Sequence, residues 1–315
     1  MTIDELRNRL QGIYPAVPTP LTPAGSLDEK GLRRLTAHLL EGGVHGLWVM
    51  GSGGSYVTYS PGERQAVIRV VLQETGGRIP VLAGAGECGT RKAIETLAAV
   101  ADVGADAAFV TTPYYFIHDQ AELRGYFDSI AEDSTLPFVV YNNPINTQNG
   151  LTVETVAYLA RQERILGVKD SSCDFGFFQR LVQRLKSFPD FRIFQGGEFL
   201  VAPSLLLGAD GAIFGLANVV PRLCVSLYRA AKNQDVNQVI QLQEDFLQVL
   251  EVEDIHGRGN DRSFLGGIQA ALELLGICGR TLPKPFATFS LEEVRRVANI
   301  LESKGIALDY SSVNS

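Results

Sequence analysis

Gly104-Ala-Asp-Ala-Ala-Phe-Val110 and Gly208-Ala-Asp-Gly-Ala-Ile-Phe214 share one local pattern, and Gly43-Val-His-Gly-Leu-Trp-Val49 repeats it more loosely. In each segment a glycine closes an amphipathic stretch, and small residues then lead into a short apolar run. A glycine at this place ends a helix at low conformational cost, and the apolar run has the character of a strand that is buried on both faces. The recurrence therefore predicts a repeated βα unit.

The same apolar character recurs at similar intervals, in runs that end on glycine, proline or polar residues. The eight runs are Tyr14–Thr19, Gly46–Met50, Val81–Ala85, Ala107–Val110, Phe138–Tyr141, Ile165–Lys169, Phe191–Gln195 and Gly211–Phe214. Helical spacing separates them, as in Leu32, Leu35 and Leu39, and Ser26 is the expected N-cap of that helix. Successive βα units predict an α/β protein with a (β/α)8 TIM barrel. A doubly wound open sheet is the alternative, but Val17-Pro-Thr-Pro20 stands where its dinucleotide-binding glycines belong.

Beyond the eighth run the sequence shows helical periodicity alone. Helices are expected at Leu223–Lys232, Asn237–Glu251, Phe264–Leu275 and Leu291–Lys304. Only the first of these is needed to complete a barrel. We therefore predict a barrel over residues 1–225 and a C-terminal helical extension over residues 226–315, which packs on the barrel.

Composition narrows the class of protein further. The net charge of −7 disfavours nucleic-acid binding, which needs a basic face. The four cysteines lie far apart without a CxxC pair, which argues against a disulfide framework and fits a reducing compartment. The N-terminal segment lacks the basic-then-apolar order of a signal peptide, and the uncharged stretches are too rich in glycine or asparagine to span a membrane. We expect a cytoplasmic protein with no nucleic-acid or membrane partner.

The end of the sixth run carries the sharpest chemical signal. Barrel enzymes place their active sites at the C-terminal ends of the strands, and Lys169 stands at such an end, whereas the other six lysines lie in polar helix or loop contexts. A lysine that is desolvated there binds its proton less tightly and becomes a nucleophile toward carbonyls. The alternative is an ordinary ion pair with Asp170 or Glu198.

Neighbouring strand ends supply groups that suit this chemistry. The fifth run ends at Tyr141, whose hydroxyl could move protons for an imine, although strand-end tyrosines commonly serve packing. The second run ends in Gly51-Ser-Gly-Gly-Ser55, whose N–H and hydroxyl groups could hold a carboxylate or phosphate. The tyrosine pair of Thr111-Thr-Pro-Tyr-Tyr115 suits interface packing, catalysis or both. No pair of histidines has metal-ligand spacing, so we predict no metal site.

These motifs resemble, in order and over essentially the whole chain, the dihydrodipicolinate synthase/N-acetylneuraminate lyase family of pyruvate-dependent class I aldolases. The residues that carry the resemblance are Gly51-Ser-Gly-Gly54, Thr112-Pro-Tyr-Tyr115, Tyr141-Asn-Asn-Pro144, Gly167-Val-Lys-Asp-Ser-Ser172, Gly208-Ala-Asp-Gly211 and Leu282-Pro-Lys-Pro285. The resemblance implies a TIM barrel with a C-terminal helical extension. It also implies no cofactor beyond a covalent lysine imine with the substrate, and a homotetramer built as a dimer of dimers.

The resemblance assigns roles to particular residues. It implies that Lys169 forms a Schiff base with a 2-oxo acid such as pyruvate, and that Tyr141 is the general acid/base. It implies that Ser52 links Tyr141 to a Tyr115 that reaches in from the neighbouring subunit, and that Ser52 and the two following amides hold the substrate carboxylate. The expected substrate-binding residues are Gly53, Gly54, Asn146, Ser171, Gly196 and Glu198, beside the catalytic set Lys169, Tyr141, Tyr115 and Ser52.

Departures from the family pattern bear on the substrate. Gly53 and Ser55 replace a hydroxyl residue and a glutamate of the family's first motif. Asn146 stands where dihydrodipicolinate synthases carry an arginine for the second substrate's carboxylate, and Pro144-Ile-Asn-Thr147 is similar to the Pro-x-Asn-Thr of 4-hydroxy-2-oxoglutarate aldolases. Gly196-Gly-Glu-Phe199 keeps one of the two acids that grip sugar hydroxyls in sialic acid lyases, which disfavours a long polyol.

The leading hypothesis is a metal-independent class I aldolase. It cleaves or forms a carbon–carbon bond in a short 4-hydroxy-2-oxo acid, with pyruvate as the half that forms the imine. A condensing enzyme of the dihydrodipicolinate synthase kind and a deoxy-oxo sugar acid dehydratase start from the same imine and are the alternatives within the enzyme class. The changes in the carboxylate motif also suit a non-catalytic homologue that binds 2-oxo acids without turnover.

Overall fold

The computed structural model describes residues 2–310 of the chain. Within this range the strands form a closed barrel in the order β1 to β8, which confirms the predicted TIM barrel. The strands are β1 (Gly12–Val17), β2 (Leu47–Val49), β3 (Val81–Gly84), β4 (Ala107–Thr111), β5 (Phe138–Asn142), β6 (Ile165–Asp170), β7 (Arg192–Gln195) and β8 (Gly211–Phe214). Every predicted apolar run overlaps one of them. The first strand begins two residues before the predicted run, at Gly12, and ends at Val17.

Helices connect the strands and follow the last one. The longer helices are α1 (Ile3–Arg9), α2 (Glu29–Glu41), α3 (Pro61–Thr75), α4 (Thr90–Val103), α5 (Gln120–Asp133), α7 (Val153–Leu159), α8 (Phe175–Leu185), α9 (Val201–Leu207), α10 (Pro221–Lys232), α11 (Val236–Leu250), α12 (Asp261–Leu274) and α13 (Leu291–Ser303). The short ones are η1 (Tyr56–Thr58), α6 (Pro144–Thr147), η2 (Glu198–Leu200), η3 (Leu216–Asn218) and η4 (Glu251–Asp254). Helices α10 to α13 confirm the predicted C-terminal helices. In the part of the chain described, no helix is long and apolar enough to cross a membrane.

The chain divides into two compact units. The first comprises Met1–Tyr14, His45–Trp48 and Ile79–Ile213, and the second comprises Pro15–Val44, Val49–Arg78 and Phe214–Ser315. Each unit is made of three segments that are not consecutive in the sequence. The predicted boundary between residues 225 and 226 therefore stays a prediction, and its outer ends, Met1 and residues 311–315, lie outside the described residues.

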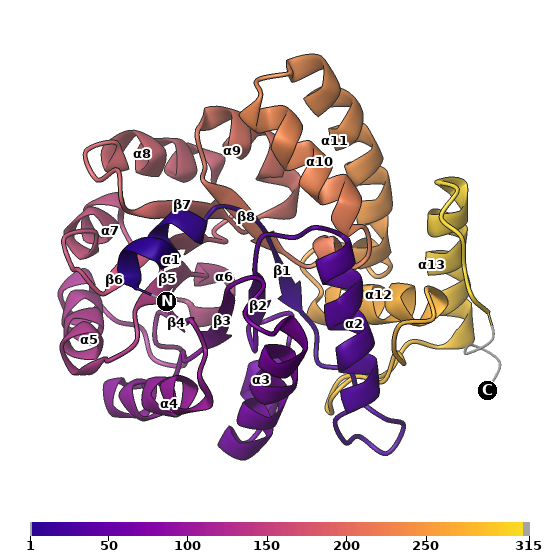
Figure 1. Cartoon of the computed structure of the whole chain (residues 1–315), viewed down its shortest axis with the longest axis horizontal. Helices are drawn as coiled ribbons and strands as arrows, with labels where there is room; N and C mark the ends of the chain where they lie inside the picture. Colours follow the sequence, from indigo (N-terminus) through magenta and orange to yellow (C-terminus); the bar gives the residue numbers. More distant parts are fainter. Residues whose placement is uncertain (1, 311–315) are drawn as a thin grey trace. The chain divides into compact units, whose positions relative to one another are not determined.

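Aromatic side chains fill the interior of the first unit. Trp48 of β2 stacks on Phe109 of β4 with ring centroids 3.6 Å apart, and Tyr141 of β5 meets both rings edge-on. Helices α4, α5, α7 and α8 lie outside strands β4 to β6, where successive helices pack against each other (Figure 1). Gly104 and Gly208 end α4 and α9 with φ values of 93° and 114°, so the glycine pattern predicted these helix ends correctly.

The start of α2, in the second unit, corrects one expectation. The predicted N-cap was Ser26, but the helix begins after Asp28, whose carboxylate accepts a hydrogen bond from the Gly31 N–H at 2.9 Å. An antiparallel bridge between Leu21 and Leu27 closes a turn over residues 23–26, which includes Ser26. The helix cannot begin until this bridge has ended, and Asp28 is the first residue beyond it with a capping side chain.

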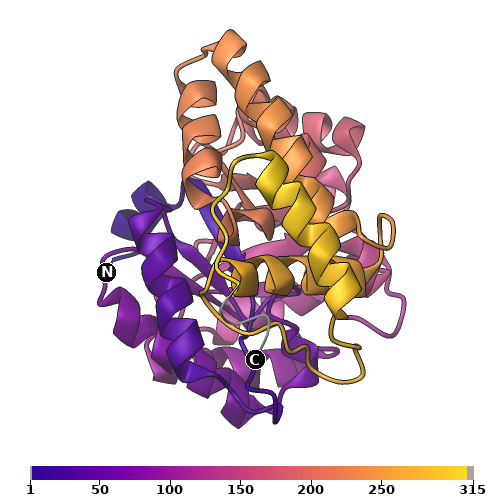
Figure 2. The same cartoon turned by 90° about the vertical axis from the view of Figure 1, so that its right-hand side faces the viewer.

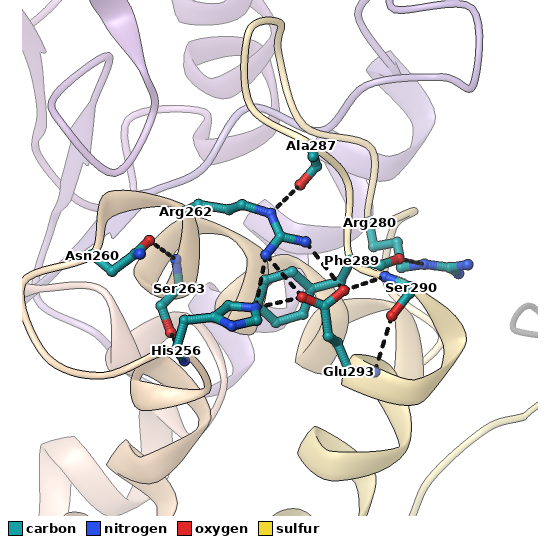
Figure 3. A network of polar contacts seen from close by, with 9 residues as sticks. All are labelled: His256, Asn260, Arg262, Ser263, Arg280, Ala287, Phe289, Ser290 and Glu293. Atoms are coloured by element: carbon teal, nitrogen blue, oxygen red, sulfur yellow. Dashed lines mark hydrogen bonds and ion pairs between the residues drawn. The ribbon is translucent and has the colours of Figure 1, made fainter.

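The C-terminal helices of the second unit are joined by a polar network. Helix α13 packs against α12 (Figure 2), and Glu293 of α13 lies between Arg262 of α12 and His256 of the loop before it (Figure 3). Arg262 Nη1 lies 2.8 Å from Glu293 Oε1, His256 Nε2 contacts the same oxygen, and the Ser290 N–H donates to Glu293 Oε2 at 2.6 Å. Burial favours a raised pKa for the Glu293 carboxyl, but the hydrogen bonds from these three partners outweigh it and lower the pKa to about 2.

Candidate active site

Lys169 lies at the end of β6 among aromatic rings. The residue is 4% exposed, and its Nζ lies 4.3 Å from the ring centroid of Tyr141 and 5.1 Å from that of Trp48. Burial lowers the pKa of the Lys169 ammonium, while charge interaction and hydrogen bonding with Tyr141, followed by the charge of Glu198, oppose the shift. A lysine with a lowered pKa presents a neutral, nucleophilic amine at lower pH than a solvated lysine does.

Strand register brings Tyr141 to Lys169. The two residues are direct partners in the parallel pairing of β5 with β6, so their side chains point to the same face. Thr111 of β4 is the partner of Tyr141 on its other side. The Thr111 hydroxyl is buried, and its Oγ1 has no hydrogen-bond partner among residues 2–310. A lysine, a phenol and a free hydroxyl therefore occupy one layer at the carboxyl ends of three neighbouring strands.

Asp170 points to the opposite face of β6 and does not form the ion pair that was the alternative for Lys169. Its carboxylate accepts hydrogen bonds from Asn142 Nδ2 at 2.8 Å and from Ser172 Oγ at 2.9 Å. Burial raises the pKa of Asp170, and these hydrogen bonds oppose the shift. The charge interaction of Lys169 is instead with Glu198, at the start of η2.

Gly196, directly after β7, packs so closely against the lysine side chain that there is no room for a Cβ. A Cβ at this position would lie 2.0 Å from Ser171 Oγ and 2.8 Å from Lys169 Cε. The Gly196 N–H donates to the Asp170 carbonyl at 2.7 Å, which fixes this close approach. The structure thus brings Ser171, Gly196 and Glu198 together with Lys169, as their predicted role in substrate binding requires. That role itself stays a prediction.

Tyr115 lies on an exposed loop, and Asn146 lies in the short helix α6. Tyr115 is 79% exposed and has a φ of 83°, a left-handed conformation that is costly for a residue with a side chain. The buried Asn149 holds this turn, because its Nδ2 donates to the carbonyls of Pro113 at 2.8 Å and Phe116 at 2.7 Å. Asn146 is an exposed residue of α6. The predicted contact of Tyr115 with a neighbouring subunit stays a prediction.

The glycine-rich loop after β2 belongs to the second unit. The Gly54 N–H donates to the Gly51 carbonyl at 3.0 Å, and the Ser55 N–H to the Ser52 carbonyl at 2.9 Å. A Cβ at Gly53 would lie 2.9 Å from the Ala16 carbonyl oxygen, and one at Gly54 would lie 3.1 Å from that of Val17. The close passage of β1 therefore explains both glycines. The roles predicted for Ser52, Gly53 and Gly54 in binding a carboxylate stay predictions.

Three residues of the first unit that line or support the site were missed from the sequence. They are Trp48, Asn143 and Asn149. Trp48 is the single tryptophan of the chain, and its place inside a predicted barrel strand was the available signal. Asn143 contacts Tyr141, and Asn149 contacts the loop that carries Tyr115. No local sequence pattern predicts such contacts. Among residues 2–310 no cluster of His, Cys, Asp or Glu could hold a metal ion.

Comparison with known proteins decides the family. The model of the dihydrodipicolinate synthetase family matches residues 9–304, nearly the whole chain. The chain belongs to this family. It is therefore an enzyme from a family of Schiff-base lyases and aldolases, as the motifs at the strand ends predicted.

Relatives in the family carry different activities. The chain is 36% identical to a 4-hydroxy-tetrahydrodipicolinate synthase of Methanopyrus kandleri, over 88% of this chain and 90% of that protein. It is 32% identical to the "probable 2-dehydro-3-deoxy-D-pentonate aldolase YjhH" of Escherichia coli, over 95% of this chain and 98% of that protein. The crystal structure of Escherichia coli YagE in complex with pyruvate is similar with a TM-score of 0.89 and 30% identity, over 95% of this chain and 99% of that one.

Proposed function

We propose that this enzyme is a cofactor-independent class I aldolase that cleaves or forms the carbon–carbon bond of a short 4-hydroxy-2-oxo acid, with pyruvate as the imine-forming half. The observation that carries the proposal is the buried Lys169 amine, 4.3 Å from the Tyr141 ring centroid at the carboxyl ends of β5 and β6. A lysine whose pKa is lowered by burial suits attack on a carbonyl carbon, and the adjacent phenol suits proton transfer.

The first half of the reaction forms the imine. The neutral Nζ of Lys169 adds to C2 of the 2-oxo acid, and loss of the C2 oxygen as water leaves an iminium ion between C2 and Nζ. Gly196 permits the close packing of Ser171 against the lysine side chain, because it carries no Cβ. The positive iminium attracts electrons from C3, so a bond at that carbon breaks without a metal ion.

The second half breaks the bond between C3 and C4. Tyr141, as the phenolate, takes the proton of the C4 hydroxyl. The electron pair of the C3–C4 bond then moves into the C2–C3 bond as the C2=N electrons move to nitrogen, and C4 leaves as an aldehyde. Tyr141 returns the proton to C3 of the resulting enamine, and water releases pyruvate from Lys169. Condensation is the same sequence reversed.

Borohydride trapping tests the imine. Incubation of the enzyme with pyruvate and borohydride is expected to attach a reduced pyruvate to Lys169, which peptide mass spectrometry locates. Lys169→Ala is expected to lose the adduct, and Lys92→Ala is the matched control, because Lys92 is an exposed lysine of α4. Absence of an adduct on the unmodified enzyme, or an adduct on Lys92, would contradict the proposal.

A condensing synthase is the second candidate. The 36% identity to a 4-hydroxy-tetrahydrodipicolinate synthase favours it. The uncharged Asn146 favours the aldolase, because it stands where synthases of this kind carry an arginine. A panel of short 4-hydroxy-2-oxo acids, assayed for pyruvate release beside a condensation assay with pyruvate and an aldehyde acceptor, separates them. Cleavage of a 4-hydroxy-2-oxo acid supports the aldolase. Turnover in the synthase assay alone would replace it.

A further inference from the structure

Asn143, between β5 and α6, does not use its side chain to cap the helix that follows it. Asn143 is the N-cap of α6, and asparagine at an N-cap normally hydrogen-bonds to the N–H groups of the first helical turn. Here its side chain makes no such bond. Its Nδ2–H donates instead to the hydroxyl oxygen of Tyr141 at 3.2 Å. The capping side chain is directed into the active site.

The main chain of Asn143 is fixed independently of this bond. Its carbonyl accepts hydrogen bonds from the Thr147 N–H at 3.0 Å and from Thr147 Oγ1 at 3.0 Å. Thr147 Oγ1 also lies 2.7 Å from Thr112 Oγ1, which ties α6 to the segment after β4. Asn143 is 4% exposed, so water does not readily replace its amide at the Tyr141 oxygen. The donor is rigid and sheltered.

We propose that Asn143 is a positioning residue that stabilises Tyr141 as the phenolate during proton transfer. This inference rests on the proposed function, in which Tyr141 takes the C4 hydroxyl proton of the substrate. When the phenol loses its proton, the oxygen becomes negative while the Asn143 N–H still points at it. A hydrogen bond to a charged oxygen is stronger than one to a neutral oxygen, so Asn143 favours the charged form.

Charged and aromatic groups of the first unit also surround Tyr141. Lys169 of β6 is the adjacent ionisable group, and Glu198 acts on that lysine by its charge. From β2 and β4 the tyrosine meets the uncharged rings of Trp48 and Phe109. The role proposed for Asn143 is to stabilise the Tyr141 phenolate. This role is separable from imine formation, which is the role of Lys169.

Two substitutions test the proposal with readouts that a structural role would not move. Asn143→Leu removes the donor, and Asn143→Asp replaces it with an acceptor of nearly the same shape. Both are expected to retain the borohydride-trapped pyruvate on Lys169 and to keep KM within about twofold, while kcat falls by about tenfold or more. The acid limb of the kcat–pH profile is expected to move to higher pH, further for Asn143→Asp than for Asn143→Leu, because each makes the phenolate harder to form.

The controls distinguish failure of the role proposed for Asn143 from failure of the proposed function. Asn8→Asp, at an exposed asparagine of α1, makes the same change of charge far along the sequence and should leave kcat unaltered. Normal trapping together with an unshifted kcat–pH profile in both Asn143 variants overturns the inference and leaves the proposed function intact. Loss of kcat without a pH shift, accompanied by loss of trapping, also overturns it, because Asn143 would then serve only the fold. Failure of the unmodified enzyme to trap pyruvate removes the proposed function and this inference with it.

Discussion

Lys169 in the first unit and Glu293 in the second are both ionisable groups largely withdrawn from water. Lys169 is 4% exposed as a residue, and the side chain of Glu293 is 13% exposed. Around Lys169 the nearest groups are aromatic rings, and burial lowers its pKa toward the neutral form. Around Glu293 an arginine, a histidine and a backbone N–H converge, and its pKa is lowered toward the charged form despite burial.

The difference lies in how far the protein compensates a buried charge. Hydrogen bonds satisfy Glu293, so the charged form holds α13 to α12 and contributes to stability. Lys169 is compensated only in part, so its ammonium is costly and its neutral amine is available. A buried ionisable group with incomplete compensation, at the end of a barrel strand, indicates reactivity, whereas a fully bonded one indicates structure.

The largest expected effect comes from removing the undercompensated charge. Lys169→Met should abolish trapping and lower turnover by at least about ten-thousandfold, because the covalent route disappears. The same change should raise the free energy of unfolding at pH 7 by about 1 kcal/mol, because an apolar group replaces a poorly compensated charge. Thermal unfolding and kinetics on one preparation check both. A fall in stability would break the contrast with Glu293.

The pH dependence of that gain follows from the sign of the shift. The pKa of Lys169 is lower in the folded than in the unfolded protein, so the unfolded state binds more protons and stability rises with pH. The advantage of Lys169→Met should therefore be largest at low pH, where Lys169 is charged in both the folded and the unfolded protein. It should shrink as the pH rises toward the ordinary lysine value of about 10.4.

The opposite behaviour is expected at Glu293. Its pKa falls from 4.5 to about 2 on folding, so its contribution is fully present above pH 4.5 and disappears as the pH falls toward 2. Glu293→Gln should cost about 3 kcal/mol at pH 7 and much less at pH 2 to 3. Urea unfolding at several pH values measures this. Glu292→Gln, at the exposed neighbouring position, is the control, and an equal loss in both variants would refute the assignment.

The buried amide of Asn149 extends the comparison to an uncharged group, for which we expect a smaller effect. Asn149→Ala removes the amide that donates to the Pro113 and Phe116 carbonyls on either side of Tyr115. The expected loss is about 2 kcal/mol and is independent of pH between 5 and 9, because the Asn149 amide does not titrate. Chemical unfolding measures it against Asn237→Ala, an exposed asparagine of α11. A loss that depends on pH would mean that a charged neighbour takes part.

The barrel and its strands could be predicted because each strand is a local event in the sequence. A continuous apolar run such as Ile165–Lys169 is buried wherever parallel strands are covered on both faces. The start of α2 could not be predicted in the same way. The bridge between Leu21 and Leu27 forms between residues that propensity treats separately, and it displaces the cap from Ser26 to Asp28.

The candidate site divides along a similar line. Lys169 and Tyr141 could be found because both end apolar runs, and adjacent parallel strands bring such ends together. The Asn143 bond to Tyr141 depends on a side chain leaving its ordinary capping position, and the Asn149 bonds join two loops more than thirty residues apart in sequence. The orientation of a side-chain amide depends on the groups that the folded site places around it, so it could not be predicted from the sequence.

Gly196 sets a limit on how the enzyme can be redesigned. A single methyl group there would collide with both Ser171 and Lys169, so variant libraries that aim to change the substrate should leave this position untouched. Asn146 is exposed and Ser171 half-buried, and both stay predicted substrate-binding residues. If those two roles hold, changes of substrate in this branch are expected at Asn146 and Ser171, whereas Gly196 stays a glycine.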